Sequence, residues 1–313
     1  MGGGSGETMI RVRFRPLSPF SSEVEAYTLF GAVCWGVGVL FGERVLRELI
    51  QRFSEGDPPF LISSPLPERE GEIMLPKPVL DVYDWGDGEE DYRNSKEYKK
   101  IRYIPLSVFR RILKGELRGE RKIFEELEKK GYLHHYGDRE TVVHATVNRI
   151  TWTVIEGLHT EEISLIGPFS VLIKFRDTSW EDKVLAALRF SQFGSNRSTG
   201  RGRCEVYRVE GFGDLEDFQE GPRFVSLSPH LYDPDIDYSR SGYEILPFAG
   251  AVDNFFGRLT RPIWKKRVLY FRSGGVFRPK RKKELYGRCG EALNYNGIRV
   301  LQYGLSFPIF MRW

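Results

Sequence analysis

The sequence predicts an α+β protein made of two ferredoxin-like domains in tandem, with a long hairpin-bearing insertion in the first domain. In the first half, strand-like and helix-like segments follow one another in the order βαββαβ. In the second half, Leu-Ser-Pro at 227–229 follows a strand-like run, as Leu-Ser-Pro at 17–19 does near the start, which indicates an internal duplication. A length of 313 residues also exceeds what one hydrophobic core usually fills.

Hydrophobic spacing defines the first elements. Residues 10–15 alternate apolar and basic side chains, as expected of a strand with one buried face. Between 28 and 53 apolar residues recur at helical spacing, and the glycines among them predict a kink or a division into two helices. Residues 60–64 then form a short strand that two prolines close.

The regular pattern is lost from about 75 to 167, which we interpret as an insertion. Charged helical segments are expected within 108–130. A β-prone stretch at 144–153 turns near Glu156 and returns through 162–166, and so predicts a projecting hairpin. Irregular segments of this length in compact domains are usually functional or disordered.

The last elements of the first half surround a glycine-rich loop. Residues 169–175 form a strand, and Thr178 with Glu181 forms a capping box for the helix that follows. The helix leads into residues 191–203, here called the glycine loop, and a strand at 203–209 leaves it. This order of elements is the one that RNA-recognition motifs use.

We place the first domain at 9–215 and the second at 216–313. The second contains strand-like runs at 223–229, 268–277 and 299–308. Residues 1–8, which are rich in glycine, are expected to be an added linker, with Met9 as the natural start.

Charge is distributed unevenly along the chain. The net charge is only +4, but residues 258–288 carry twelve Lys or Arg and one acid. Residues 68–91 carry nine acids and two basic residues. Such polarity suggests a basic surface for polyanions and an acidic surface for another contact, although each run is equally consistent with a solvated face.

Three distant cysteines without a CxxC pair support neither a zinc ribbon nor a disulfide framework. They fit a reducing, cytoplasmic setting, and no apolar run approaches the ~20 residues of a membrane span. We expect no cofactor and no metal.

The glycine loop contains three glycines, several hydroxyls and arginines, and no acid. Glycine lets backbone N–H groups approach an anion, and arginine adds a planar set of donors, so the loop could hold phosphate. A nucleotide P-loop or a dinucleotide fingerprint would follow a strand and open a helix, whereas this loop does the reverse. Two interpretations stay open, a solvated connection or a contact with a nucleic-acid backbone.

Several segments together resemble one family. They are Tyr27–Gly36, Pro59–Ser64, the hairpin around Asn148–Ile150, Phe193–Gly202 and Val300–Pro308. In this order they are similar to the RAMP proteins of CRISPR systems, and among these to subunit four of the type III-A (Csm) effector. The resemblance runs from Met9 to the end of the sequence.

The resemblance implies a non-catalytic, RNA-binding subunit in antiviral defence that caps the 5′ handle of the crRNA. It also implies docking to the large polymerase-like subunit and to the adjacent backbone RAMP subunit. The hairpin would be the family's thumb, which wedges between handle and guide. The acidic 68–91 and basic 258–288 stretches have no counterpart in the resemblance.

The alternative is a RAMP-type pre-crRNA endoribonuclease that uses a histidine as general acid/base. The chain has five histidines, at 134, 135, 144, 159 and 230. Only His144 and His159 fall on the predicted hairpin, and no sequence pattern places a base beside either. We therefore expect no catalytic residue.

RNA contacts are expected from four places. The loop would hold phosphates through its N–H groups and arginines, and the strand-to-helix junction at 17–28 would offer an aromatic ring for stacking. The hairpin would provide a cation and a wedge, and a second glycine turn would add further contacts. The candidates are Ser18, Phe20, Thr28, Asn148, Arg149, Ile150, Gly194, Ser195, Asn196, Arg197, Ser198, Thr199, Gly200, Arg201, Gly202, Arg272, Gly274 and Gly275. Residues 280–283 are expected to give non-specific attraction or solvation.

Overall fold

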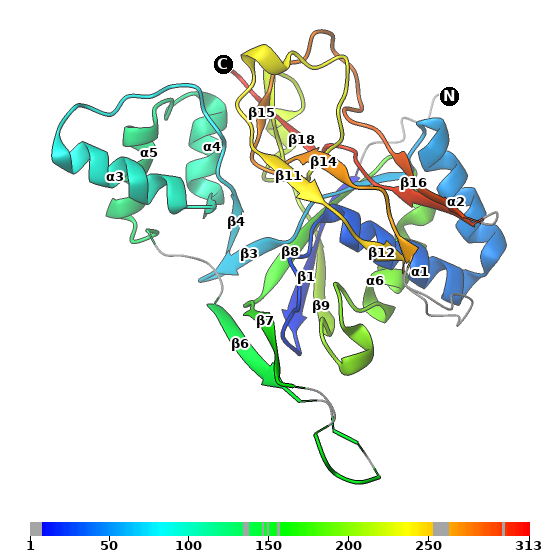
Figure 1. The fold of residues 1–313 in the computed structure, drawn as a ribbon. Coiled ribbons are helices and arrows are strands. Elements are labelled where there is room, and N and C mark those ends of the chain that lie inside the picture. Colours follow the sequence, from blue (N-terminus) through cyan, green and yellow to red (C-terminus); the bar gives the residue numbers. More distant parts are fainter. Residues whose placement is uncertain are drawn as a thin grey trace, which may run out of the picture.

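A seven-stranded antiparallel sheet forms the centre of the molecule (Figure 1). The computed structural model describes residues 8–133, 138–145, 147–148, 150–154, 157–252, 263–295 and 298–313. The strands of this sheet are β1 (Thr8–Pro16), β2 (Phe60–Ile62), β3 (Leu66–Arg69), β4 (Glu72–Pro76), β5 (Tyr103–Pro105), β8 (Phe169–Phe175) and β9 (Cys204–Gly211). Their order is β5-β4-β3-β8-β1-β9, with β2 also paired to β8.

The first half has the predicted βαββαβ order. β1 lies between β8 and β9, and β2 and β3 lie beyond β8, all in antiparallel pairs. Val12 and Phe14 are fully buried on one face of β1, as the alternation predicted. Thr8, assigned to the linker from the sequence, already pairs with Phe175.

Two helices pack together on the buried face of the sheet. The predicted helical stretch is divided into α1 (Ala26–Phe41) and α2 (Glu43–Glu55), and α1 packs against α6 (Glu181–Phe190). A Cβ at Gly36 would lie 2.7 Å from the Cβ of Ala187, so glycine permits this close approach. The predicted capping box is wrong in detail, because Asp177 caps a 3-10 turn, η1 (Thr178–Trp180), that precedes α6.

The insertion begins with a lobe of three helices, seen at the left of Figure 1. These are α3 (Glu89–Lys100), α4 (Leu106–Lys114) and α5 (Glu120–Lys129), packed around buried residues such as Trp85, Phe109 and Phe124. The sequence interpretation missed α3, because its acids were counted as a solvated run. They lie in the first turn, and lysines lie in the last, where each complements the helix dipole.

The insertion continues as the predicted hairpin, which projects from the body (Figure 1). Its strands are β6 (Asp138–His144) and β7 (His159–Leu165). Glu156, near which the sequence predicted the turn, lies outside the described residues. The chain reverses at 148–152, where the Asn148 carboxamide accepts the N–H groups of Ile150 and Thr151.

The second half is built mainly from short strand pairs. The strands are β10 (Arg223–Ser226), β11 (Ile245–Phe248), β12 (Ala251–Val252), β13 (Ile263–Trp264), β14 (Val268–Phe271), β15 (Val276–Phe277), β16 (Gly290–Tyr295), β17 (Ile298–Gln302) and β18 (Pro308–Met311). β10 lies between β15 and β18. Beyond β9, the helical segments that the described residues contain are two 3-10 turns, η3 (Glu216–Phe218) and η4 (Tyr238–Arg240). A second ferredoxin-like domain is therefore not confirmed.

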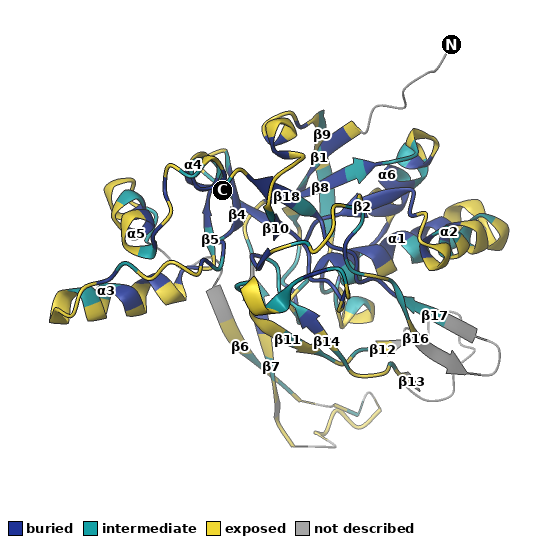
Figure 2. Cartoon of the chain, turned by 90° about the horizontal axis from the view of Figure 1, so that it is seen from above, coloured by how far each residue is buried: buried dark blue, intermediate teal, exposed yellow. Residues whose placement is uncertain are grey.

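The two halves share one hydrophobic core. Tyr303 packs against Phe30 and Phe53 of the helices, and its hydroxyl accepts the N–H of Ile62 at 3.2 Å. β18 also contacts α4 of the insertion lobe. Buried residues cluster at the centre of the molecule and exposed residues on α2, α3 and α5 (Figure 2). The domain boundary near 215 stays a prediction.

No helix within the described residues is long and apolar enough to cross a membrane.

Candidate nucleic-acid interface

The glycine loop uses part of its backbone to hold itself in place. The N–H groups of Thr199 and Arg201 donate to the carbonyl of Asn196 at 3.1 and 3.3 Å, and Gly202 N–H donates to the carbonyl of Pro19 at 2.9 Å. These N–H groups are already bonded, so the prediction that N–H groups along the whole loop hold phosphate is too broad. In this part of the loop, an anion would be bound by side chains.

The loop presents several polar side chains to solvent. Those of Ser195, Asn196, Ser198 and Thr199 are exposed, and Gly200 lies beside them. Arg197 opens the 3-10 turn η2 (Arg197–Thr199), and its guanidinium carbon lies 5.7 Å from the centre of the Trp35 ring. Burial lowers the pKa of Arg197 from its ordinary value. The exposed face of the loop therefore consists chiefly of hydroxyl and amide groups.

The strand-to-helix junction at 17–28 lies against the loop, as the sequence predicted. Ser18 Oγ accepts the N–H of Arg203 at 2.9 Å, and Ser22 Oγ accepts the N–H of Ser195 at 3.3 Å. Gly194 also lies close to Ser22, since a Cβ there would be 3.1 Å from the hydroxyl oxygen. The two segments thus form one continuous surface.

Phe20 and Thr28 have different positions in this junction. The Phe20 ring is 1% exposed and meets the Phe169 ring edge-on, so the prediction that it stacks on a base is wrong. Thr28 lies in the first turn of α1, where its N–H donates to the carbonyl of Glu25 at 2.9 Å, and its side chain is half-buried.

Glu25, which precedes α1, is a buried acid that the sequence interpretation missed. It is 6% exposed and accepts a hydrogen bond from the Ser64 hydroxyl, which in turn accepts the N–H of Ala26. Burial raises the pKa of Glu25 to about 7, against the opposing effects of the Ser64 hydrogen bond and of Arg102 and Arg272. The junction therefore contains a carboxyl group that titrates near neutral pH.

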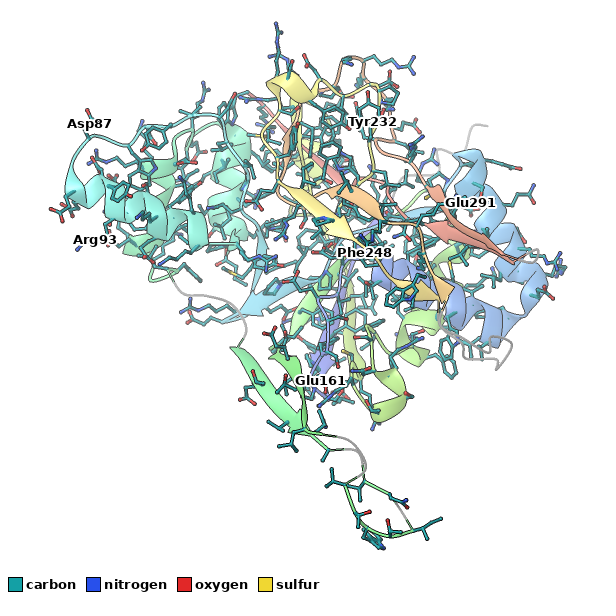
Figure 3. The ribbon with its side chains drawn as sticks, in the orientation of Figure 1. Asp87, Arg93, Glu161, Tyr232, Phe248 and Glu291 are labelled. Carbon is teal, nitrogen blue, oxygen red and sulfur yellow. The ribbon has the colours of Figure 1, made fainter. Side chains whose placement is uncertain are left out.

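A second acid, Glu161 on β7, joins the hairpin to the glycine loop. Its carboxylate accepts Asn196 Nδ2 at 2.7 Å and Arg201 Nη2 at 3.0 Å, and it lies 2.9 Å from His144 Nε2. The nearby hydroxyl of Ser21, and then the hydrogen bonds from Asn196, Arg201 and His144, lower the pKa of Glu161 to about 2. Figure 3 shows Glu161 where the hairpin meets the body of the protein.

The hairpin base is also attached by a pair of backbone hydrogen bonds between Phe20 and Ser164 (3.0 and 2.7 Å). At its far end two large apolar side chains face solvent. Ile150 is 90% exposed and Trp152 is 81% exposed. Arg149, the predicted cation, lies outside the described residues. The sequence predicted a strand at Trp152, but the residue lies in the turn, where its ring is exposed to solvent.

The glycines of the second glycine turn are not exposed for the predicted RNA contact, and the contact of Arg272 stays a prediction. Gly274 and Gly275 are buried, and Gly274 links β10 to the insertion, since its N–H donates to Ser226 and its carbonyl accepts the N–H of Val79. Arg272 is half-buried, with Nε 3.8 Å from a Glu244 carboxylate oxygen. The turn is therefore a packing element.

The basic stretch at 280–283 is largely paired with acids. Lys283 donates to Asp233, which is 2% exposed, and to Asp235, while Arg281 also donates to Asp235. Lys282 pairs with Glu220. These contacts hold the stretch on the surface of the second half.

The described histidine side chains have ordinary structural surroundings. His230 is fully buried against the rings of Phe271 and Phe277, and burial lowers its pKa to about 3. Among the described histidine side chains, His144 is the one that reaches the surface, and it is held by Glu161. His134 and His135 lie outside the described residues, and only the backbone of His159 is described.

Comparison with known proteins gives a partial sequence match. No family model matches the chain. A curated relative from Thermococcus onnurineus (strain NA1), the "CRISPR system Cms protein Csm4", is 31% identical over 106 residues. The match covers 32% of this chain and 36% of the relative, so the chain matches about a third of the length of that protein.

Solved structures match over nearly the whole chain. A chain in the Csm1-Csm4 cassette in complex with pppApA has a TM-score of 0.61, 18% identity and coverage of 97% of this chain and 98% of its own. A chain in the Csm3-Csm4 subcomplex of the type III-A CRISPR-Cas interference complex has a TM-score of 0.60, 17% identity and coverage of 96% and 98%. At these identities the matches show the fold. The curated relative and both structural complexes carry the name Csm4, in agreement with the resemblance that the sequence shows to subunit four of the type III-A effector.

Proposed function

We propose that the chain is a non-catalytic RNA-binding subunit of a type III-A effector and that it caps the 5′ handle of the crRNA. The observation that carries this proposal is the convergence of three distant segments on one surface. The glycine loop hydrogen-bonds to the junction through Gly202 and Pro19, and to the hairpin through Asn196 and Glu161. The loop, the junction and the hairpin base thereby form one polar surface on which a strand of RNA can lie.

The chemistry of this surface suits a nucleic-acid backbone. The exposed hydroxyls of Ser198 and Thr199 and the carboxamide of Asn196 can bond phosphate oxygens or the 2′-OH, and the latter distinguishes RNA from DNA. The arginines at 197 and 201 add positive charge close by. Such contacts fix the position of a strand without reading its bases, as a cap requires.

The hairpin tip supplies a different kind of contact. The exposed Trp152 ring can stack on an unpaired base, an interaction worth about 1–3 kcal/mol, and Ile150 beside it can act as an apolar wedge. We propose that this end of the hairpin separates the handle from the guide.

The related structures carry the names Csm1-Csm4 cassette and Csm3-Csm4 subcomplex. We accordingly propose that this chain docks the large polymerase-like subunit and the adjacent backbone RAMP subunit of its own effector, in a role in antiviral defence.

The loop's part in RNA binding is tested with Arg197→Ala combined with Arg201→Ala. Affinity for a handle RNA is expected to fall, and the slope of log K against log salt to flatten by about 1.4, since each phosphate contact on a single strand contributes about 0.7. The matched control is Arg189→Ala with Arg208→Ala, which removes two exposed arginines outside the loop. A slope unchanged by the loop variant would show that the loop does not hold phosphate.

The absence of catalysis is tested with repeat RNA incubated with the protein, with and without divalent metal ions. We expect intact RNA on a denaturing gel, as the proposed binding role requires. His144, whose ring lies 2.9 Å from the Glu161 carboxylate, is the histidine to substitute. Specific cleavage that His144→Ala abolishes would instead support the endoribonuclease.

A further inference from the structure

Glu161 lies in a site whose donors come from two parts of the chain. Asn196 and Arg201 belong to the glycine loop and His144 to β6. An amide, a guanidinium and an imidazole therefore surround one carboxylate. Glu161 is the acid on which these contacts between described residues converge.

The same set of donors is suited to a phosphate group. A carboxylate and a phosphate both present oxygens that accept charge-assisted hydrogen bonds, and the arginine fork matches either of them. The low pKa of Glu161 shows that the site favours a negative charge. In the free protein, the anion in this site is the carboxylate of Glu161 itself.

The site is also within reach of a ligand. The side chains of Arg201 and Glu161 are 18% and 16% exposed, so the pair is partly shielded from salt but not sealed from solvent. It lies directly beside the exposed face of the loop, because Asn196 belongs to both. A strand of RNA along that face would bring its phosphates next to Glu161.

Displacement of Glu161 would not detach the hairpin. The backbone pair between Phe20 and Ser164 holds its base independently of the carboxylate. After loss of the Glu161 contacts this backbone pair would still hold the hairpin base, and the hairpin could then change its angle to the loop.

We propose that Glu161 fills an oxyanion site built for a phosphate of the RNA, and that RNA binding exchanges the carboxylate for the phosphate and unlocks the hairpin from the glycine loop. This inference rests on the proposed function. Before binding, Glu161 keeps Arg201 and Asn196 in position and keeps other polyanions out. After binding, the same donors hold the RNA.

The test compares Glu161→Gln with Glu162→Gln, using the affinity of the full-length chain for a handle RNA at constant salt. Glutamine keeps the shape of Glu161 but removes the charge that competes for Arg201, so affinity is expected to rise about tenfold. Glu162 is the next residue on the same strand and is exposed, so its variant controls for the loss of one negative charge. An affinity of Glu161→Gln equal to or below that of Glu162→Gln would mean that Glu161 is a permanent clamp and would overturn the inference.

A second ligand separates this inference from the proposed function. Binding of inorganic tripolyphosphate is measured by calorimetry for the native protein and the two variants. If none of them binds handle RNA, the proposed function is overturned, while tighter tripolyphosphate binding by Glu161→Gln than by Glu162→Gln would still support the oxyanion site. If RNA binds but neither ligand binds Glu161→Gln more tightly, the proposed function stands and the exchange is wrong.

Discussion

Replacing Glu25 by glutamine is expected to increase the free energy of unfolding by about 3 kcal/mol at pH 8 and to change it little at pH 4. The carboxyl group has a pKa of about 7 in the folded protein, against its ordinary value of 4.5. Near pH 4 the carboxyl group is mostly protonated in both the folded and the unfolded protein, so its ionisation changes the free energy of unfolding little. Between pH 4.5 and 7 the unfolded chain loses its proton first, so stability falls as the pH rises. Above pH 7 the difference is complete, at about 1.4 kcal/mol for each pKa unit.

Glutamine is the informative substitution because it keeps an oxygen to accept the Ser64 hydroxyl and cannot ionise. The measurement is urea unfolding of both proteins at intervals from pH 4 to pH 8. Glu48→Gln, on an exposed position of α2, controls for the loss of one carboxylate. A difference between Glu25→Gln and the native protein that stays constant over this range would show that the buried carboxyl does not titrate between pH 4.5 and 7.

Replacing Gly202 by valine is expected to lower the free energy of unfolding by more than about 3 kcal/mol and to abolish binding of handle RNA. Gly202 has φ +68°, which costs other residues about 1–2 kcal/mol. A Cβ there would also lie 1.8 Å from the carbonyl oxygen of Phe193. Phe193 is 1% exposed and packs edge-on against Phe14, so relieving the overlap would move a core residue.

Gly200→Val is the matched control, two positions away in the same loop. Gly200 also has a positive φ, +88°, but a Cβ at this position would meet no described atom within 4 Å. Backbone strain therefore acts alone there, and a loss of about 1 kcal/mol is expected. Thermal or urea unfolding of the two variants distinguishes overlap from strain. Equal losses would show that the contact with Phe193 yields easily, contrary to the expectation.

The main elements of the first half outside the insertion could be predicted because local periodicity encodes them. β1 alternates apolar and basic residues, and the stretch that forms α1 and α2 repeats at helical spacing. Periodicity works less well beyond β9. There the strands are as short as the two residues of β15, and their partners are distant, as when β10 pairs with β18 across more than eighty positions. The expected tandem repeat relied on one shared tripeptide, Leu-Ser-Pro at 17–19 and 227–229, and a tripeptide does not predict helices.

The candidate site shows the same division between local and distant signals. The contact between the glycine loop and the junction followed from the order of strands β9 and β1, which places their ends together. Glu25 and Glu161 could not be found in this way, because their partners Ser64 and Arg201 lie 39 and 40 positions along the chain. Phe20 failed for a related reason, since residue type alone does not tell a ring that stacks on a ligand from a ring that fills the core.

β18 and α4 are far apart in the sequence but in contact in the fold, so the packing of one depends on that of the other. Trp313 Nε1 donates to the carbonyl of Ile112 across 201 positions, and the N–H of Arg312 donates to Leu113. Closing so long a loop is slow compared with forming a helix, because its entropy is lost before any contact compensates. We expect the three helices of the lobe to form early and the packing of the lobe to be completed only once β18 is in place. The rate at which the lobe becomes fully packed is therefore expected to follow the rate at which the whole chain folds.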